Sequence, residues 1–326
     1  MRAPEFWRRG GGLFGGLLAP LGWGYGLGTW LRFAFTKPYR SDVPVLCIGN
    51  LVAGGAGKTP VALSLGGYLA ERGLTVHYLG RGYGGIEKGP LRVDLGAHGA
   101  GDVGDEALLL AAVAPTWISV NRAAGVEAAG AGADFIIMDD GFQNPSVAKD
   151  LSLVVVDGRY GFGNERLIPA GPLREPVARA LDRAHALIVI GEDEAGIGGH
   201  PKVKKSNLPV LKATVTPGPE ASALKGKAVV AFAGIGEPEK FFRTLSSIGG
   251  RVQAAHAFPD HHRYTTNEIQ RLKQEAADMG AILVTTTKDA VRLAASDLNG
   301  IEVLTISLEW RDETALDAVL NPIFGV

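Results

Sequence analysis

The sequence has 326 residues, of which 46% are hydrophobic and 21% are charged, and its net charge at pH 7 is −1. This composition is typical of a folded protein and excludes a largely disordered chain, while the length predicts two domains. The net charge argues against nucleic acid as a partner, because such a partner calls for a clustered basic face. The only cysteine, Cys47, excludes a disulfide within the chain and indicates a reducing compartment.

The N-terminal segment, residues 1–36, is expected to associate with a membrane. From Gly10 to Leu31 the sequence has no charged residue, a length that just suffices to cross a bilayer. Its many glycines weaken a continuous helix, and its aromatic residues suit the membrane interface better than the centre. We therefore expect a monotopic segment in the headgroup region, held by aromatic side chains and flanking basic residues. A membrane span, a buried glycine-rich helix and a secretory signal are the alternatives.

After Pro44, short apolar runs alternate with helical patterns. Strands are expected at residues 43–49, 75–80, 134–140 and 151–158, and helices at residues 58–72, 105–114 and 122–131. The strands are almost continuously apolar, which is typical of a parallel sheet covered on both faces. This β-α-β series predicts a doubly wound α/β domain of the P-loop NTPase type.

A second series of strands and helices follows the stretch Arg159–Glu175, which is rich in Gly, Pro and Asn. Strands are expected at residues 186–191, 208–215, 228–234 and 281–287, and helices at residues 238–247 and 266–279. We expect a P-loop kinase domain over residues 37–165 and a second, smaller α/β domain over residues 166–312. A C-terminal helix is expected over residues 313–326, in a position from which it can return to the first domain.

The stretch VAGGAGKTP, residues 52–60, is similar to a phosphate-binding loop, but it begins with Val52 where the common pattern has glycine. A strand precedes it and a helix follows it, so backbone N–H groups and the helix N-terminus converge on an anion. Lys58 is expected to contact the β- and γ-phosphates, and Thr59 is expected to place its hydroxyl on Mg²⁺. The nucleotide-binding residues expected from this loop are Gly54, Gly55, Ala56, Gly57, Lys58 and Thr59.

The apolar run FIIMDD ends with Asp139 and Asp140 at the carboxyl edge of the sheet, where open α/β folds bind ligands. Asp139 is expected to take the Walker B role, through Mg²⁺ or its water shell. Asp140 stands before Gly141, and turn formation is the alternative role for it.

Two further polar pairs are candidates. Asp105 and Glu106 open a helix, and composition alone favours a capping role for them. His261 and His262 lie beside Asp260, and a histidine at a domain junction can orient a carboxylate that takes a hydroxyl proton. Simple surface exposure is the commoner explanation for such histidines.

Taken together, the motifs resemble those of the tetraacyldisaccharide 4′-kinases of lipid A biosynthesis. They are GNLVAGGAGKTP (49–60), GRGYGG (80–85), VGDE (103–106), NR (121–122), DDGFQN (139–144), FGNERLIPAGPLREP (162–176), FPDHHRY (258–264) and TTKDAVR (286–292). The resemblance covers nearly the whole chain in order, and the DDGFQ and PAGPLREP stretches make it specific. The family loop does not need the first glycine, which accounts for Val52. Asn144 stands where many members have His, and Ala107 where many have Pro.

The resemblance implies that the γ-phosphoryl group of ATP is transferred to the 4′-hydroxyl of an acylated glucosamine disaccharide 1-phosphate, which forms lipid IVA. It implies Mg²⁺ as the cofactor ion and the cytoplasmic face of the bacterial inner membrane as the location, with the protein peripheral or monotopic. Asp105 becomes the candidate base, paired with His261 of the second domain, which reverses the preference for capping. Glu106 becomes a candidate Mg²⁺ contact beside Thr59 and Asp139.

Substrate contacts are expected from residues within these motifs, since an arginine can bind the lipid 1-phosphate in bidentate fashion. The expected set is Asn50, Arg81, Tyr83, Arg122, Asp140, Gln143, Asn164 and Arg174. Solvated surface or ion pairing between the domains is the alternative role for the less specific members.

Two other functions compete with the lipid kinase. The loop is also similar to those of nucleotide switches that act in metal insertion or partitioning, but the sequence has no Asn-Lys-x-Asp guanine motif. A soluble nucleoside or sugar kinase fits the same chemistry and leaves the N-terminal segment unexplained.

Overall fold

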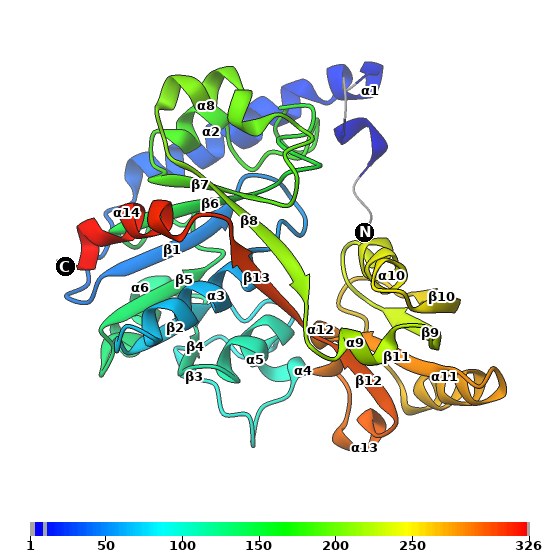
Figure 1. Cartoon of the computed structure of the whole chain (residues 1–326). Coiled ribbons are helices and arrows are strands. Elements are labelled where there is room, and N and C mark those ends of the chain that lie inside the picture. The colour runs from blue at the N-terminus through cyan, green and yellow to red at the C-terminus, as the bar shows by residue number, and fades with distance from the viewer. Residues whose placement is uncertain (1–3, 9–11, 325–326) are drawn as a thin grey trace.

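The computed structural model describes residues 4–8 and 12–324, which form a nine-stranded sheet and a four-stranded sheet (Figure 1). Residues 1–3 and 9–11 of the expected N-terminal segment, and residues 325–326 of the expected C-terminal helix, lie outside the described residues. The strand order of the larger sheet is β13-β8-β7-β6-β1-β5-β2-β4-β3. Its strands are β1 Val45–Asn50, β2 Val76–Gly80, β3 Leu91–Arg92, β4 Thr116–Ile118, β5 Phe135–Asp139, β6 Leu151–Asp157, β7 Ala186–Ile190, β8 Val210–Pro217 and β13 Ile306–Trp310.

Most of the larger sheet is parallel. The edge strands β13 and β3 pair antiparallel with their neighbours, and the strands between them pair in parallel. The strands at its centre, such as β1 and β5, are buried along their whole length, which agrees with their continuous apolar sequence. This architecture confirms the predicted α/β fold class.

Helices cover both faces of the larger sheet. Side chains of α3 Lys58–Ala70, α5 Asp105–Ala111 and α14 Glu313–Phe324 contribute to the core on one face. Side chains of α6 Arg122–Gly130, α7 Val177–Leu181 and α8 Pro201–Ser206 contribute to the core on the other face. Three short helices, α4 Ala100–Val103, η1 Glu5–Trp7 and η2 Ile197–Gly199, lie in connecting segments.

The smaller sheet is parallel, with the strand order β10-β9-β11-β12. Its strands are β9 Ala228–Ala233, β10 Arg251–Ala257, β11 Ile282–Thr286 and β12 Ile301–Leu304. The helices of this part are α9 Ala221–Leu224, α10 Pro238–Ser247, α11 Thr266–Asp278, α12 Thr287–Ala290 and α13 Ala295–Leu298. Buried residues of α10 and α11 lie in two separate clusters, one on each face of the sheet.

The division between the two sheets differs from the predicted domain boundary at residue 166. β7 and β8 extend the larger sheet beside β6, and the chain enters the smaller sheet only at β9. It returns to the larger sheet with β13 and then with α14, whose Leu316 and Leu320 are buried in the same core cluster as residues of α3. The stretch Arg159–Glu175 therefore does not link the two sheets, because two further parallel strands follow it in the larger one.

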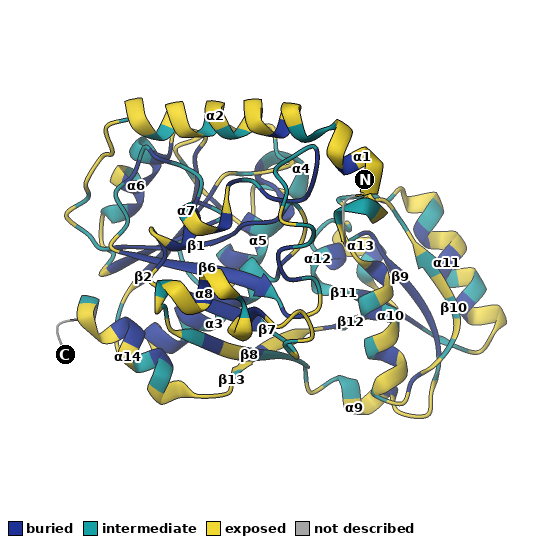
Figure 2. Ribbon diagram, turned by 90° about the horizontal axis from the view of Figure 1, so that it is seen from above, coloured by how far each residue is buried: buried dark blue, intermediate teal, exposed yellow. Residues whose placement is uncertain are grey.

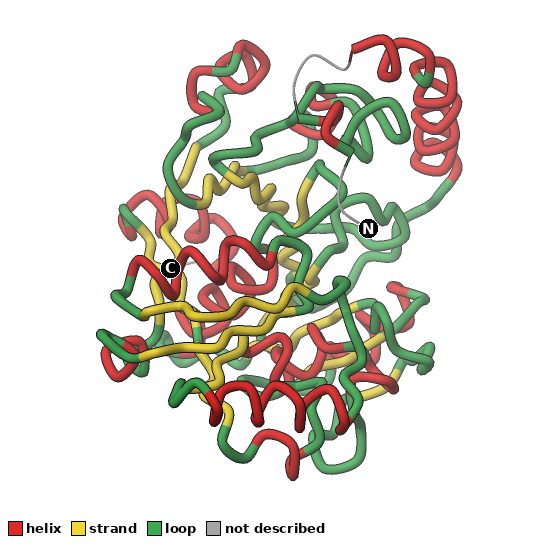
Figure 3. Tube along the Cα trace, turned by 90° about the vertical axis from the view of Figure 1, so that its right-hand side faces the viewer, coloured by secondary structure: helices red, strands yellow, loops and turns green. Residues whose placement is uncertain are grey.

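The N-terminal helices α1 Gly12–Leu17 and α2 Ala19–Phe35 lie along the outer edge of the molecule (Figures 2 and 3). Gly22 is the one buried residue of α2, where the helix lies against Leu167 of the larger domain. The two helices expose Leu13, Phe14, Leu17, Leu21, Trp23, Tyr25, Leu27, Trp30, Leu31 and Phe35. This exposure is the opposite of what a buried glycine-rich helix would show. Among the described helices, none has both the length and the apolar character that crossing a bilayer requires.

Candidate active site

The phosphate loop lies between β1 and α3. Gly57 has φ +83° directly before Lys58, the first residue of α3, and glycine adopts this left-handed conformation without strain. A Cβ atom at Gly57 would also lie 2.6 Å from Cδ1 of Ile190, so any side chain here would displace the end of the Ile190 side chain. The first amides of α3 thus face the loop, as anion binding requires.

Val52 has a structural role that explains the missing glycine. Its side chain is buried, and its backbone forms an antiparallel bridge with Leu173. The backbone N–H of Arg174 donates to the carbonyl of Leu51 at 2.8 Å. The opening turn of the loop is therefore fixed against residues 173–174, and it does not need glycine at its first position.

Lys58 lies among three polar residues that were expected to contact substrate. Its Nζ atom donates to Oδ1 of Asn50 at 3.4 Å and lies 3.6 Å from Oδ1 of Asp140. Arg174 donates to the same Asp140 oxygen at 2.9 Å. Burial would raise the pKa of Asp140, but Lys58 and Arg174 hold that pKa below its usual range. Asp140 therefore stays ionised beside the lysine of the phosphate loop.

Asp139 and Thr59 form the expected metal-binding pair. Thr59 donates its hydroxyl to Oδ2 of Asp139 at 3.0 Å, while Oδ1 of Asp139 is buried and makes no hydrogen bond. Burial raises the pKa of Asp139 to about 7, the charge of Glu106 acts in the same direction, and Lys58 opposes both. A buried carboxylate oxygen without a partner beside a threonine hydroxyl fits Mg²⁺, which prefers oxygen ligands. Among the described residues, no three His, Cys, Asp or Glu side chains are arranged to hold a metal ion by themselves, so phosphate oxygens and water would complete the coordination.

Asp105 receives hydrogen bonds from two residues of the smaller domain. Its Oδ2 atom lies 3.0 Å from Nδ1 of His261 and 2.9 Å from Nε of Arg292. Its Oδ1 atom accepts from the backbone N–H of Glu106 at 2.9 Å, but the N-cap position of α5 is Gly104, so Asp105 is not the capping residue. Burial would raise the pKa of Asp105, but the hydrogen bond with His261 and the charges of Lys288 and Arg292 hold that pKa well below its usual range. The neighbouring histidine, His262, pairs instead with Glu268 at 3.2 Å.

Two residues of this group, Lys288 and Arg292, were not assigned roles from the sequence. Lys288 donates to Oε1 of Glu106 at 3.2 Å and lies 3.9 Å from Oδ2 of Asp105. Burial would lower the pKa of Lys288, but the charges of Glu106 and Asp105 raise it, so the side chain is an ammonium. Both residues belong to the TTKDAVR motif, which was the available signal in the sequence.

Tyr83 lies beside this group, while Arg81 and Arg122 lie close to each other and Arg122 lies near Asp139 and Asp140. The ring of Tyr83 meets the ring of His261 edge to face, with 5.3 Å between the centroids. Arg122 is buried and donates to the carbonyl of Ser119, but its Nε atom makes no hydrogen bond. Burial lowers the pKa of Arg122 to about 10, and the charge of Arg81 acts in the same direction. An unpaired buried N–H beside a second arginine fits an anion such as phosphate.

Gln143 belongs to a buried polar network that the sequence did not reveal. Its amide donates to the carbonyl of Asn50 at 2.9 Å and to Oε1 of Glu175 at 3.1 Å. Glu175 is 1% exposed and forms an ion pair with Arg183, whose guanidinium lies 4.2 Å from the ring centroid of Phe33 in α2. This network connects the N-terminal helix with the residues around the phosphate loop.

Asn164 makes its contacts with the N-terminal segment. Its amide donates to the carbonyls of Phe6 and Ala170, each at 3.0 Å, and its Oδ1 accepts from the backbone N–H of Arg166 at 3.0 Å. These bonds fix its own loop and η1. The hydrogen bonds of Asn164 therefore lie in its own loop and on the N-terminal segment, and its expected contact with substrate stays a prediction.

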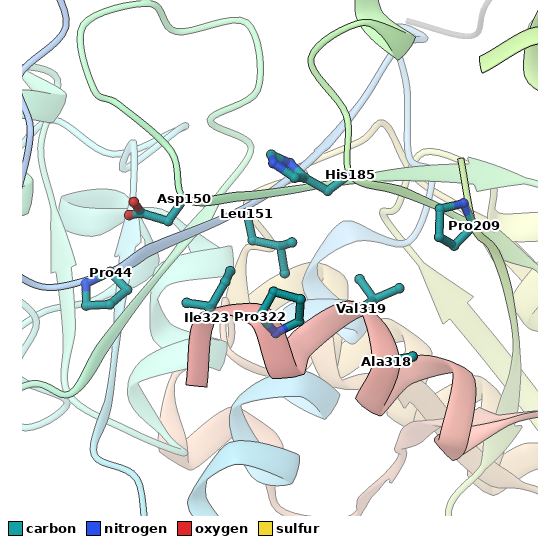
Figure 4. A pocket seen from close by; sticks show the side chains of 9 residues that line it. All are labelled: Pro44, Asp150, Leu151, His185, Pro209, Ala318, Val319, Pro322 and Ile323. Atoms are coloured by element: carbon teal, nitrogen blue, oxygen red, sulfur yellow. The ribbon is translucent and has the colours of Figure 1, made fainter. Parts of the chain in front are cut away.

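A cavity of about 610 Å³ lies at the amino ends of β1, β6, β7 and β8, the opposite edge of the larger sheet (Figure 4). Its polar residues have structural partners: Asp150 accepts from the backbone N–H of Val45 at 2.8 Å, and Nδ1 of His185 accepts from that of Ser152 at 3.0 Å. The C-terminal helix closes one side with Pro322. This cavity is separate from the acidic and basic residues described above.

Known proteins resemble the chain over almost its whole length. The family model of the tetraacyldisaccharide-1-P 4′-kinases matches residues 15–324. A tetraacyldisaccharide 4′-kinase of Rhodospirillum rubrum is 52% identical over 98% of this chain and 97% of its own, and that of Parvibaculum lavamentivorans is 49% identical over 100% and 94%. The crystal structure of LpxK from Aquifex aeolicus in complex with ATP is similar with a TM-score of 0.77 and 27% identity, covering 96% of this chain and 100% of that chain.

Proposed function

The chain belongs to the tetraacyldisaccharide-1-P 4′-kinase family. We propose that the residues around Lys58 and Asp105 catalyse its reaction. In this reaction the γ-phosphoryl group of ATP passes to the 4′-hydroxyl of an acylated glucosamine disaccharide 1-phosphate. The family match confirms the predicted family, the kinase activity in lipid A biosynthesis and the use of ATP. The observation that carries the proposed assignment of residues is the contact of Asp105 with His261 and Arg292 across the two domains.

The larger domain binds the nucleotide in this proposal. Lys58 and the amides at the start of α3 hold the β- and γ-phosphates, and Gly57 lets the backbone approach them. Thr59, Asp139 and Glu106 would hold Mg²⁺, which neutralises charge on the phosphates when it is bound. Phosphoryl transfer depends mainly on positioning and on charge stabilisation, and this arrangement provides both.

Asp105 accepts the proton of the acceptor hydroxyl in this proposal. Oδ2 is held by His261 and Arg292, and Oδ1 by the amide of Glu106, so the carboxylate has a fixed orientation. Its low pKa keeps it ionised at neutral pH. His261 contacts the same carboxylate through its Nδ1 atom and helps to hold it in this orientation.

The lipid headgroup contacts the arginine-rich side of the site in this proposal. Arg122 has an unpaired Nε atom and lies near Arg81, and Tyr83 packs on His261 at the rim of the site. Two guanidinium groups suit a phosphate monoester such as the 1-phosphate of the acceptor. Arg174 donates to Asp140, and Gln143 donates to the carbonyl of Asn50 before the phosphate loop. In this proposal both residues position these groups and do not contact the acceptor themselves.

We also propose that α1 and α2 lie in the headgroup region at the cytoplasmic face of the inner membrane. The exposed apolar residues of these helices, from Leu13 to Phe35, lie on the outer edge of the molecule (Figure 2). Exposed basic residues Arg32, Lys37 and Arg40 stand at the end of this segment, where anionic lipid attracts them. In this membrane-bound position the enzyme reaches an acceptor whose acyl chains remain in the bilayer.

A direct assay tests the proposed reaction. Purified protein is incubated with ATP labelled in the γ-phosphoryl group, Mg²⁺ and the acylated disaccharide 1-phosphate in detergent. We expect a labelled bisphosphorylated lipid. Hydrolysis of ATP without a labelled lipid would contradict the proposal and would favour a nucleotide switch.

A further inference from the structure

We propose that Lys288 is a catalytic residue, a cation that the smaller domain places beside the γ-phosphoryl group during transfer. Its Nζ atom lies 3.2 Å from Oε1 of Glu106 and 3.9 Å from Oδ2 of Asp105. Asp105 is the proposed base at the acceptor hydroxyl, and Glu106 is the proposed contact of the metal that binds the phosphates. The γ-phosphoryl group must pass from the phosphates near Glu106 to the acceptor hydroxyl near Asp105. Nζ of Lys288 lies next to both carboxylates.

Lys288 belongs to a short helix that hydrogen bonds fix to the smaller sheet. This helix is α12, whose N-cap Thr286 accepts a hydrogen bond from the backbone N–H of Asp289 at 3.1 Å. The fully buried carboxylate of Asp289 in turn accepts from the backbone N–H of Gly234 and from the hydroxyl of Tyr264, each at 2.8 Å. This network fixes α12 to the smaller sheet, so the ammonium group moves only with the whole domain or through its own side-chain torsions.

The neighbouring Arg292 has a different role. Its side chain is buried, and it donates to the carbonyl of Gly234 at 2.7 Å, to Asp289 at 3.0 Å and to Asp105. Its donors are therefore committed to protein partners. Lys288 carries three N–H donors and makes one hydrogen bond to the described residues, so it retains donors for the phosphoryl oxygens.

The charge balance of the site calls for such a cation. The larger domain contributes four carboxylates, those of Asp105, Glu106, Asp139 and Asp140, to a site that must accept the anionic phosphates of ATP. Lys58 and Arg174 lie beside Asp140, and Arg292 pairs with Asp105, whereas Lys288 is the cation beside Glu106. In phosphoryl transfer, negative charge spreads over the equatorial oxygens of the transferred group, and a cation supplied there accelerates the step. Lys288 supplies this charge from the opposite domain.

Lys288 takes part in the step without exchanging any atom. The acceptor oxygen forms a bond to the γ-phosphorus, and the bond between that phosphorus and the bridging oxygen of the β-phosphate breaks. The electron pair of the broken bond leaves with ADP, and the hydroxyl proton passes to Asp105. Lys288 remains protonated and stabilises the charge that develops on the phosphoryl oxygens.

A second ion pair between the domains provides a matched control. Lys240 of α10 pairs with Asp157 at the carboxyl end of β6, so it also joins the smaller domain to the larger one. It contacts none of the residues assigned to the reaction. If Lys288 only helped to hold the domains together, its removal and the removal of Lys240 would have similar effects.

Selective alkylation tests the proposal within a single folded protein. Cys47 is buried and is the only natural cysteine, so Lys288→Cys introduces one reactive thiol. Alkylation with 2-bromoethylamine restores an ammonium group at nearly the length of lysine, and iodoacetamide adds a neutral group at the same atom. Lys240→Cys receives both treatments in parallel. The kcat, the KM for ATP and the affinity for a non-hydrolysable ATP analogue with Mg²⁺ are measured for each sample.

We expect Lys288→Cys to lose about 10²–10³-fold in kcat, in keeping with other cations that act on the transferred phosphoryl group. Affinity for the ATP analogue should change less than about fivefold, bromoethylamine should restore at least a tenth of kcat, and iodoacetamide should not. Lys240→Cys should keep kcat within about threefold under every treatment. The proposal would be overturned if both variants lost kcat equally, or if the Lys288 variant lost only nucleotide affinity. It would also be overturned if iodoacetamide restored kcat in the Lys288 variant, or if bromoethylamine did not.

The role of Lys288 rests on the proposed lipid kinase reaction. The same experiment distinguishes failure of that reaction from failure of the role of Lys288. If the unaltered protein forms no phosphorylated lipid, the proposed reaction fails. If it forms that product and the Lys288 variant is equally fast, only the role of Lys288 fails.

Discussion

Nδ1 of His261 lies 3.0 Å from Oδ2 of Asp105, although 156 residues separate the two and they belong to different domains of the protein. The backbone leads Asp105 to this point through Gly104, which has φ +85° and whose Cβ, if present, would lie 2.3 Å from the carbonyl oxygen of Tyr83. The contact therefore depends on both domains, and the two sheets must be apposed for the proposed base to be oriented. The predictions below test this arrangement and the features that support it.

The first prediction separates catalysis by Asp105 from a structural role at the start of α5. In Asp105→Asn, asparagine keeps the oxygen that accepts from the amide of Glu106 at the start of α5, but it no longer accepts a proton. We expect kcat to fall by about 10²–10⁴-fold with nucleotide affinity preserved. The free energy of unfolding, measured with urea, should change by less than about 1 kcal/mol. A loss of stability with kcat intact would make the structural role the main one.

The second prediction concerns the metal. In Asp139→Asn a neutral amide replaces the buried carboxylate beside Thr59, and an amide binds Mg²⁺ less strongly. We expect the Mg²⁺ concentration for half-maximal activity to rise by about tenfold or more. Binding of ATP in the presence of EDTA, measured by calorimetry, should change little because Lys58 and the loop amides remain. An unchanged Mg²⁺ requirement would remove Asp139 from the metal site.

The third prediction concerns the ion pair between Arg183 and Glu175. Arg183→Met leaves the 1% exposed carboxylate of Glu175 without its cation, which destabilises a folded protein by about 3 kcal/mol. We expect that loss in the free energy of urea unfolding. Adding Glu175→Gln should recover most of it, since the uncompensated buried charge is then gone. If the double variant is as unstable as the single one, packing of Arg183 on Phe33 and Phe142 is the larger contribution.

The fourth prediction tests the exposed face of α2. Trp23 and Phe35 are 71% and 83% exposed, so replacing either with serine removes little packing within the protein. Each change should weaken binding to vesicles of anionic lipid by about tenfold, because a buried aromatic side chain contributes roughly 1.5–3 kcal/mol. Ile306→Ser, at a half-exposed position in β13, is the control and should bind as the unaltered protein does. Equal binding by all variants in sedimentation would exclude α2 as the membrane contact.

Much of the larger domain could be predicted from local patterns. The apolar runs became β1, β2, β5 and β6, and the glycines and Lys58 became a strand-loop-helix unit at the expected residues. These features depend on neighbours in sequence, which a single sequence displays. The likeness to a known family added the roles of Asp105 and His261, which local pattern alone assigned to capping and to the surface.

Contacts between distant segments could not be predicted in the same way. β7 and β8 were assigned to the second domain because a stretch rich in glycine and proline precedes them, but strand pairing is set by packing across the whole sheet. The hydrogen bond from Asn164 to Phe6, 158 residues away, also had no local signal in the sequence. For Lys288 the TTKDAVR motif was the one signal in the sequence, and its role could not be read from that motif because its two partners lie in another domain.

The position of the transferred phosphate tests the central claim most directly. The product formed from the acylated disaccharide 1-phosphate and ATP is isolated, and fragmentation in a mass spectrometer locates the new phosphate on one of the two sugars. We expect it at the 4′-position of the distal glucosamine with the unaltered protein, and almost no product with Asp105→Asn. A phosphate on another hydroxyl, or full product formation by Asp105→Asn, would contradict the proposed reaction at Asp105 and His261.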